Sequence, residues 1–128
     1  MISTNAFNYV NVLDKAADAS WKRENLLANN IANVDTPGYK RKDLDFQSLL
    51  KEELGYKNES LDAKIGRADL TQLNPMTYTD MAGYSYRMDG GNVDIDTENV
   101  ELASEQIRYT AVTTSINQEF SRMRTVLS

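Results

Sequence analysis

The stretch Asn29-Asn30-Ile31-Ala32-Asn33-Val34-Asp35-Thr36-Pro37-Gly38 closes a long helical pattern that occupies the N-terminal part of the chain. Upstream of it, apolar and small side chains recur at alternating steps of three and four residues, which places them on one face of a helix. We predict this helix from about residue 5 to residue 32. The segment 35–38 ends it, because the residue before a proline avoids the helical region and glycine permits a chain reversal. The apolar residues on this face that we expect to pack against other helices are Val10, Leu13, Leu27 and Ile31.

The C-terminal region shows the same design, with a second apolar face from about Thr97 onward. Acidic residues are concentrated at its start and arginines lie later, which suits the dipole of one continuous helix. We interpret the acidic run 94–105 in this way and not as a calcium loop, because Asn99 stands where such a loop needs glycine. The residues of this face that we expect to pack are Tyr109, Val112, Ile116, Phe120, Met123 and Leu127.

The middle of the chain has weaker patterns. Asp43 is predicted to cap a short helix that carries Phe46 and Leu50 and ends at Gly55. Residues 83–96 alternate apolar and polar side chains around Asp-Gly-Gly-Asn, which predicts a small β-hairpin, whereas residues 56–82 show no period. The fold class is therefore mostly α, with long N- and C-terminal helices paired as an antiparallel coiled-coil hairpin. The expected organisation is an N-terminal helix in 1–35, a loop region in 36–92 and a C-terminal helix in 93–128.

Composition excludes several classes of function. The chain has 128 residues, a net charge of −5, no cysteine and no histidine. Disulfides, thiolate or imidazole metal sites and Ser/His or Cys catalysis are therefore excluded. Carboxylates, Lys, Tyr and Ser remain, but none of them comes with the pattern of a site, so an enzyme is the weakest alternative and we predict no enzyme, catalytic residue, cofactor or metal. An acidic chain is also a poor partner for nucleic acid or anionic lipid. No apolar run is long enough to span a membrane, and the first residues do not resemble a cleaved signal peptide.

Two polar features invite interpretation. Asn25, Asn29 and Asn33 step by four residues along the first helix, although asparagine disfavours helix. They either bond to neighbouring chains or are polar residues tolerated on a face that packing keeps helical. The basic cluster at 40–42 is interpreted as a solvated loop, because Asp43 and Asp45 weaken its field.

The segment 28–41, ANNIANVDTPGYKR, closely resembles the signature that closes the N-terminal helix of bacterial flagellar rod, hook and hook-associated proteins. The segments 42–46 and 92–102 resemble the same family, most of all its proximal rod members. The resemblance implies a non-enzymatic axial subunit of the flagellar basal body, located in the rod within the periplasm. It also implies self-association and contact with other rod subunits and basal-body adaptor proteins, with no nucleic acid and no direct lipid binding.

The resemblance further implies passage through the flagellar type III export apparatus without a cleaved signal peptide. Phe46 and Leu50 are similar to the element that the export gate recognises, although core residues of a short helix would show the same spacing. We expect a polymer in which the terminal helices transmit torque and form part of the export conduit. The alternatives are another proximal rod subunit, or a soluble helical-hairpin binding module or export chaperone.

Overall fold

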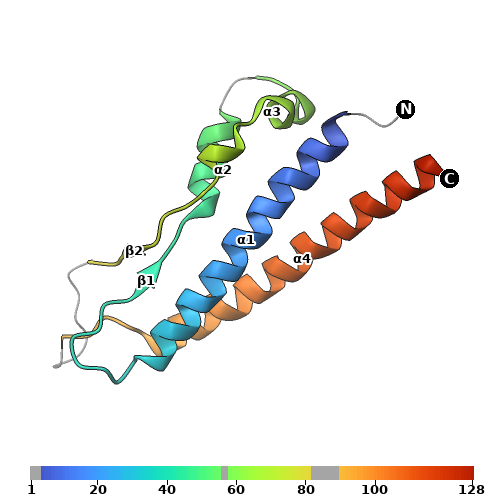
Figure 1. Ribbon diagram of the computed structural model, residues 1–128. Helices are drawn as coiled ribbons and strands as arrows, with labels where there is room; N and C mark the ends of the chain where they lie inside the picture. Colours follow the sequence, from blue (N-terminus) through green and yellow to red (C-terminus); the bar gives the residue numbers. More distant parts are fainter. Residues whose placement is uncertain (1–3, 56–57, 82–89) are drawn as a thin grey trace.

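The computed structural model describes residues 4–55, 58–81 and 90–128 and is built around two long antiparallel helices (Figure 1). Helix α1 spans Thr4–Ala32 and helix α4 spans Ile95–Leu127. They lie side by side, and the beginning of α1 and the end of α4 are at the same end of the molecule, which we call the open end. The predicted helical hairpin and the mostly α class are confirmed.

Helix α1 ends where the proline-glycine signal predicted. The Asn33 side chain donates a hydrogen bond to the Asn29 carbonyl at 2.8 Å, and the Thr36 amide donates to the Asn33 carbonyl at 3.0 Å. Gly38 has a φ of 72°, in the left-handed region that side chains with a Cβ rarely adopt. The chain therefore turns back along α1 at the end opposite to the open end, which we call the closed end.

Helix α4 begins two residues before its expected start. The Asp94 carboxylate accepts hydrogen bonds from the Asp96 and Thr97 amides and caps the helix. The prediction of a second hairpin strand at residues 93–96 is therefore wrong, because capping by Asp94 makes Ile95 and Asp96 helical. The predicted first strand, residues 83–88, lies outside the described residues.

The middle of the chain forms an arm along the other side of α1, so α1 lies between this arm and α4 (Figure 1). Strands β1 and β2 are very short and pair antiparallel, with Lys42 opposite Thr79 and Asp43 opposite Tyr78. The elements of the arm in chain order are β1 (Lys42–Asp43), α2 (Phe46–Leu54), α3 (Leu61–Arg67), the 3-10 helix η1 (Leu70–Gln72) and β2 (Tyr78–Thr79).

Helix α2 confirms the predicted short helix but not its predicted cap. The Asp45 carboxylate, not that of Asp43, accepts the hydrogen bond from the Ser48 amide at 3.0 Å. Gly55 ends the helix as expected, with its amide bonded to the Lys51 carbonyl at 3.0 Å. Asp43 and Asp45 both precede this helix. Asp43 does not cap it, because its carboxylate is paired with Arg23 and Arg41.

The arm is held to α1 by a small apolar core. Val12 of α1 contacts Ile65 of α3 and Leu73, and each of the three is buried. Ile65 and Leu73 lie in a part of the chain that showed no period, because helices of one or two turns are too short to display one. The half-buried residues that surround this core are Tyr9, Phe46, Leu50, Leu54 and Leu70.

Candidate subunit interface

A cluster of charged side chains joins both long helices to the start of the arm. Arg23 comes from α1, Arg41 and Asp43 from the segment around β1, and Glu98 and Glu105 from α4. The two glutamates are only 1% and 3% exposed. We call these five residues the polar network. Buried charges are tolerated in proteins only when they are paired and hydrogen-bonded, so the network constrains how the three segments meet.

Arg23 connects α1 to both of its neighbours. Its Nε donates to Asp43 Oδ1 at 2.8 Å, and its Nη1 donates to Glu105 Oε2 at 3.2 Å. Its Nη2 contacts Glu101 Oε2 at 3.0 Å and the second Asp43 oxygen at 3.2 Å. The planar guanidinium group therefore binds Asp43 in a bidentate manner while it also reaches α4.

Arg41 makes the corresponding connection from the segment that follows the turn. Its Nε donates to Glu98, its Nη2 donates to Asp43 Oδ2 at 3.0 Å, and its Nη1 reaches Asp80 Oδ2 at 3.3 Å. Asp43 thus accepts bonds from arginines of two different segments, and its Oδ2 accepts from both. Removing one member would leave its buried partners with fewer compensating charges.

Asn30 completes the network from α1 and is fully buried. Its side-chain nitrogen donates to the Lys42 carbonyl at 2.8 Å and to Glu98 Oε2 at 3.1 Å, and its oxygen accepts from the Lys42 amide at 2.9 Å. This one amide side chain pairs with the strand backbone as another strand would. We did not identify Asn30 from the sequence, where it is one of several asparagines.

Asn92 performs a similar role at the start of α4. Its side-chain oxygen accepts from the Arg41 amide at 2.7 Å, and its nitrogen donates to the Asp80 carbonyl at 2.9 Å. The Asn92 amide donates to the Tyr39 carbonyl at 3.2 Å. Among the described residues, every buried side-chain nitrogen and oxygen has a hydrogen-bond partner. The closed end is therefore a satisfied polar structure.

The charges of the network shift pKa values in the direction that keeps it ionised. Burial by itself raises the pKa of Asp43, but hydrogen bonds from Arg23 and Arg41 outweigh it, so the pKa lies below its ordinary value. Burial lowers the pKa of both arginines, and their bonds to carboxylates reverse this and raise it. Burial and then the charge of Glu105 raise the pKa of Glu24.

Two interpretations made from the sequence are corrected here. The basic cluster at 40–42 is not simply a solvated loop, because Arg41 is bound to Glu98 and Asp43 and only 16% of its side chain is exposed. The acidic run on α4 serves the helix dipole only in part, because Glu98 and Glu105 are buried. They lie between the predicted apolar positions on the face of α4 that contacts α1. A prediction based on apolar residues does not identify them, because they are charged.

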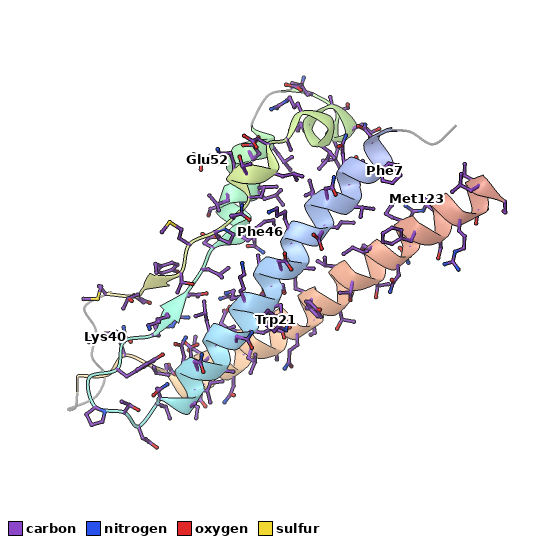
Figure 2. The ribbon with its side chains drawn as sticks, in the orientation of Figure 1. Phe7, Trp21, Lys40, Phe46, Glu52 and Met123 are labelled. Carbon is purple, nitrogen blue, oxygen red and sulfur yellow. The ribbon has the colours of Figure 1, made fainter. Side chains whose placement is uncertain are left out.

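Some of the predicted packing residues of the two long helices are buried inside the hairpin, and others are exposed on its surface. Leu27 is fully buried and Met123 is 9% exposed, so both are used within the chain. Phe120 and Leu127 are 49% and 75% exposed, and Figure 2 shows Phe7, which is exposed as well, near the same open end. The predicted residues that are half-buried are Val10, Leu13, Ile31, Tyr109, Val112 and Ile116.

Other large apolar side chains of the two long helices are more than half exposed. Trp21 on α1 is 56% exposed, whereas Val100 and Ile107 on α4 are 65% and 72% exposed. Exposed apolar side chains on one helix face are typical of protein interfaces. They define a candidate interface for association with other helices.

The asparagine stripe lies partly on this surface. Asn25 and Asn29 are exposed, and Asn33 is half-buried, with its oxygen accepting from the Thr36 hydroxyl at 3.1 Å. Asn33 therefore also has a local role in ending α1. The expected bonds of the stripe to neighbouring chains stay a prediction.

Phe46 and Leu50 both lie in α2 and pack against the apolar core around Val12. Figure 2 shows Phe46 at the beginning of α2, where the arm follows α1. This position agrees with the alternative that they are core residues of a short helix. It does not test recognition by an export gate.

Within residues 4–55, 58–81 and 90–128, no cluster of three or more acidic side chains could hold a metal ion. In the same part of the chain, neither long helix is apolar enough over its length to cross a bilayer.

Comparison with known sequences agrees with this architecture. The family described as flagella basal body rod protein matches residues 15–40, the end of α1 and the turn that follows. The match points to the class of flagellar basal body rod proteins.

Full-length relatives narrow the class. The protein named flagellar basal body rod protein FlgB from Bacillus subtilis is 36% identical over 118 residues, covering 91% of this chain and 90% of the relative. Proteins of the same name from Proteus mirabilis and Escherichia coli K12 are 34% and 31% identical, each over 83% of this chain. The chain belongs to the FlgB family.

Proposed function

We propose that this chain is a structural subunit of the bacterial flagellar proximal rod and polymerises through its two terminal helices. Family membership supports the structural role in the basal body. The observation that carries the mode of assembly is the exposure of apolar side chains on both long helices, at positions such as Ile107 and Leu127. Burying each such side chain against a neighbour is worth roughly 1.5–3 kcal/mol, which favours association.

The polar network supports a role in torque transmission. A subunit that carries torque has to keep its helices in fixed relative positions under load. The network connects α1 to α4 through Arg23 and connects α4 to the turn through Arg41. When a helical array of such hairpins is twisted, the load on one long helix of a subunit passes to the other long helix of the same subunit through these ion pairs.

The remaining parts of the proposal concern partners and location. We propose that the subunit lies in the rod within the periplasm, contacts other rod subunits and basal-body adaptor proteins, and lines part of the export conduit. It reaches this place through the flagellar type III export gate, which would bind Phe46 and Leu50. Because these two side chains pack against α1 in the folded chain, gate binding requires that the arm has not yet docked.

The chain has relatives named as rod proteins, so a soluble binding module or an export chaperone is not favoured. The family is a structural one and not a known enzyme family.

The test compares residues of the predicted packing set that the fold buries to different extents. Leu27→Asp and Ile116→Asp should abolish incorporation into the rod, but Leu27 is fully buried, so loss of the fold would have the same effect. Leu127→Asp avoids this problem, because that side chain is 75% exposed. We expect the variant to fold and not to enter basal bodies.

Each variant is expressed in a strain of a flagellated bacterium from which the native copy of this protein has been deleted. Swimming and the amount of the chain in purified basal bodies are then measured. Met76→Asp is the matched control, because Met76 is 86% exposed but lies in the arm. Normal swimming with Leu127→Asp would contradict assembly through the terminal helices. Absence of the unmodified chain from basal bodies would overturn the rod assignment itself.

A further inference from the structure

The middle of α4 has an unusual composition for a long helix. Five of the seven residues in segment 110–116 are β-branched, and no other window of seven residues in α1 or α4 contains as many. A β-branched side chain loses rotational freedom in a helix, so its helix propensity is lower than that of alanine or leucine. We call residues 110–116 the central segment. Its own sequence favours a helix less than the sequence on either side does.

Hydroxyl groups of the central segment bond to the backbone of the preceding turn. Thr110, Thr113 and Ser115 each donate a hydrogen bond to the carbonyl oxygen four residues earlier, at 3.0 Å. A hydroxyl that shares a carbonyl with a backbone amide slightly destabilises a helix and often bends it. Elsewhere in the described helix α4, one further bond of this kind is found, at Thr125. The effect is therefore concentrated in the central segment.

The central segment also lies in the stretch of α4 that the rest of the chain holds least. Glu105 is the last residue of α4 in the polar network, and the next buried side chain is that of Met123. The structure describes α4 along its whole length, and every side chain between these two residues is half-buried or exposed. Regions with few buried contacts move at low free-energy cost. The packing therefore does not fix the helix at the point where its sequence is weakest.

We propose that the central segment is a hinge in α4. In the free chain, the part of α4 beyond residue 116 changes its direction relative to the part that the polar network holds against α1. Low helix propensity, carbonyls shared with hydroxyls and the lack of buried side chains coincide in this segment. Each of them lowers the cost of bending the helix there.

The hinge determines what moves at the open end. The residues beyond it include Phe120, Val126 and Leu127, which are 49%, 56% and 75% exposed. In the proposed rod, the hinge allows this apolar end of α4 to adjust its direction to the helices that pack against it. The inference goes beyond the rod function. It concerns the free chain, so its test does not depend on assembly.

Distances between pairs of spin labels test the hinge. The chain has no native cysteine, so labels can be attached at introduced cysteines alone. The open-end pair is Asn11→Cys on α1 with Arg124→Cys on α4, which lies beyond the hinge. The closed-end pair is Asn25→Cys on α1 with Asn99→Cys on α4, which lies before it. All four residues are exposed. Pulsed electron paramagnetic resonance on the purified chain gives the distribution of distances for each pair.

We expect the distribution to be at least twice as broad for the open-end pair as for the closed-end pair. The triple variant Thr110→Ala, Thr113→Ala, Ser115→Ala should narrow the open-end distribution, because alanine favours the helix and the hydroxyl bonds are lost. The matched control replaces three exposed hydroxyl residues of α4 outside the central segment, Ser104, Ser121 and Thr125, by alanine. It should leave the width unchanged.

Three results would overturn the hinge. The first is equal widths for the two pairs in the otherwise unmodified chain. The second is an open-end distribution that stays equally broad in the triple variant, and the third is equal narrowing in the control. The second and third would show that the end of α4 frays, or that alanine stiffens α4 wherever it is placed. The rod function is tested separately by the amount of the chain in basal bodies.

Discussion

At the scale of single residues, the polar network explains most of how the closed end is built. Glu98 sits where an apolar residue would be expected, yet it is paired with Arg41 and Asn30 and is 1% exposed. A buried ion pair contributes little net stability, because the cost of removing both charges from water offsets their attraction. Its effect is specificity, since an arrangement of α1, the turn and α4 in which these groups did not meet would leave buried charges unpaired.

Truncating one member of this network should be far more costly than truncating an exposed one. Glu98→Ala removes the most buried carboxylate partner of Arg41 and an acceptor of Asn30, so we expect the free energy of unfolding to fall by about 3–5 kcal/mol. Glu101→Ala is the matched control on the same helix, because 43% of its side chain is exposed and such pairs contribute about 0–1 kcal/mol. Urea unfolding of both variants measures the difference, and equal losses would contradict the structural role of Glu98.

The network should also make the protein sensitive to acid. The pKa of Asp43 is lowered below its ordinary value of 3.8, because bonds from Arg23 and Arg41 outweigh the opposing effect of burial. Such a group stabilises the fold above its unfolded pKa, and this contribution is lost as the pH falls through the lowered native value.

We therefore expect the free energy of unfolding to decrease on acidification from about pH 5 downward, and less steeply in Asp43→Asn. Asp45 also has a lowered pKa, chiefly from its bonds to Ser48, so some slope should persist in the variant. Urea unfolding at a series of pH values checks this. Identical slopes in both proteins would show that Asp43 is not held ionised by the network.

At the scale of elements, α1 has two distinct packing faces. One face meets α4 through residues such as Leu27, and another meets the arm through Val12. The arm is a chain of short helices, each begun by a capping side chain, namely Asp45, Ser60 and Asp69. Helices this short are not stable alone, so their order depends on the contact with α1.

The core between the arm and α1 provides a test of this dependence. Leu73 is 1% exposed, so Leu73→Ala should cost about 2–5 kcal/mol and release the arm from α1. Leu61→Ala is the control, because Leu61 lies in the same arm and is 56% exposed. Circular dichroism and hydrogen exchange should show loss of α2 and α3 in the first variant, with α1 and α4 retained. Loss of all four helices together would mean that the arm and the hairpin form one cooperative unit.

At the scale of the whole molecule, the two ends of the hairpin differ in how completely they are satisfied. The closed end has the turn, the polar network and the cap of α4, whereas the open end exposes Phe7, Phe120 and Leu127. Regions with few buried contacts open at low free-energy cost. The polar groups of the closed end are therefore satisfied within the chain, whereas we expect the open end to be ordered by contact with neighbouring subunits.

Hydrogen exchange on the free chain should reveal this gradient. We expect slow exchange for the amides of residues 20–30 and 98–109, next to the network, and fast exchange for residues 4–9 and 118–127. Adding basal-body fragments should slow exchange at the open end. Uniformly slow exchange along both helices in the free chain would contradict the view that neighbouring subunits complete it.

The amino-acid sequence by itself determined the two long helices, the turn that ends the first, the short helix closed by Gly55 and the family. Each of these depends on local spacing or local backbone preference, which can be detected within a single segment. Tertiary structure alone decided the roles of Asn30, Asp43, Glu98 and Ile65, because their partners lie on other segments of the chain. The sequence does not distinguish a carboxylate in water from a carboxylate that is buried against an arginine. Only the packing of α1, the turn and α4 shows that Glu98 is of the second kind.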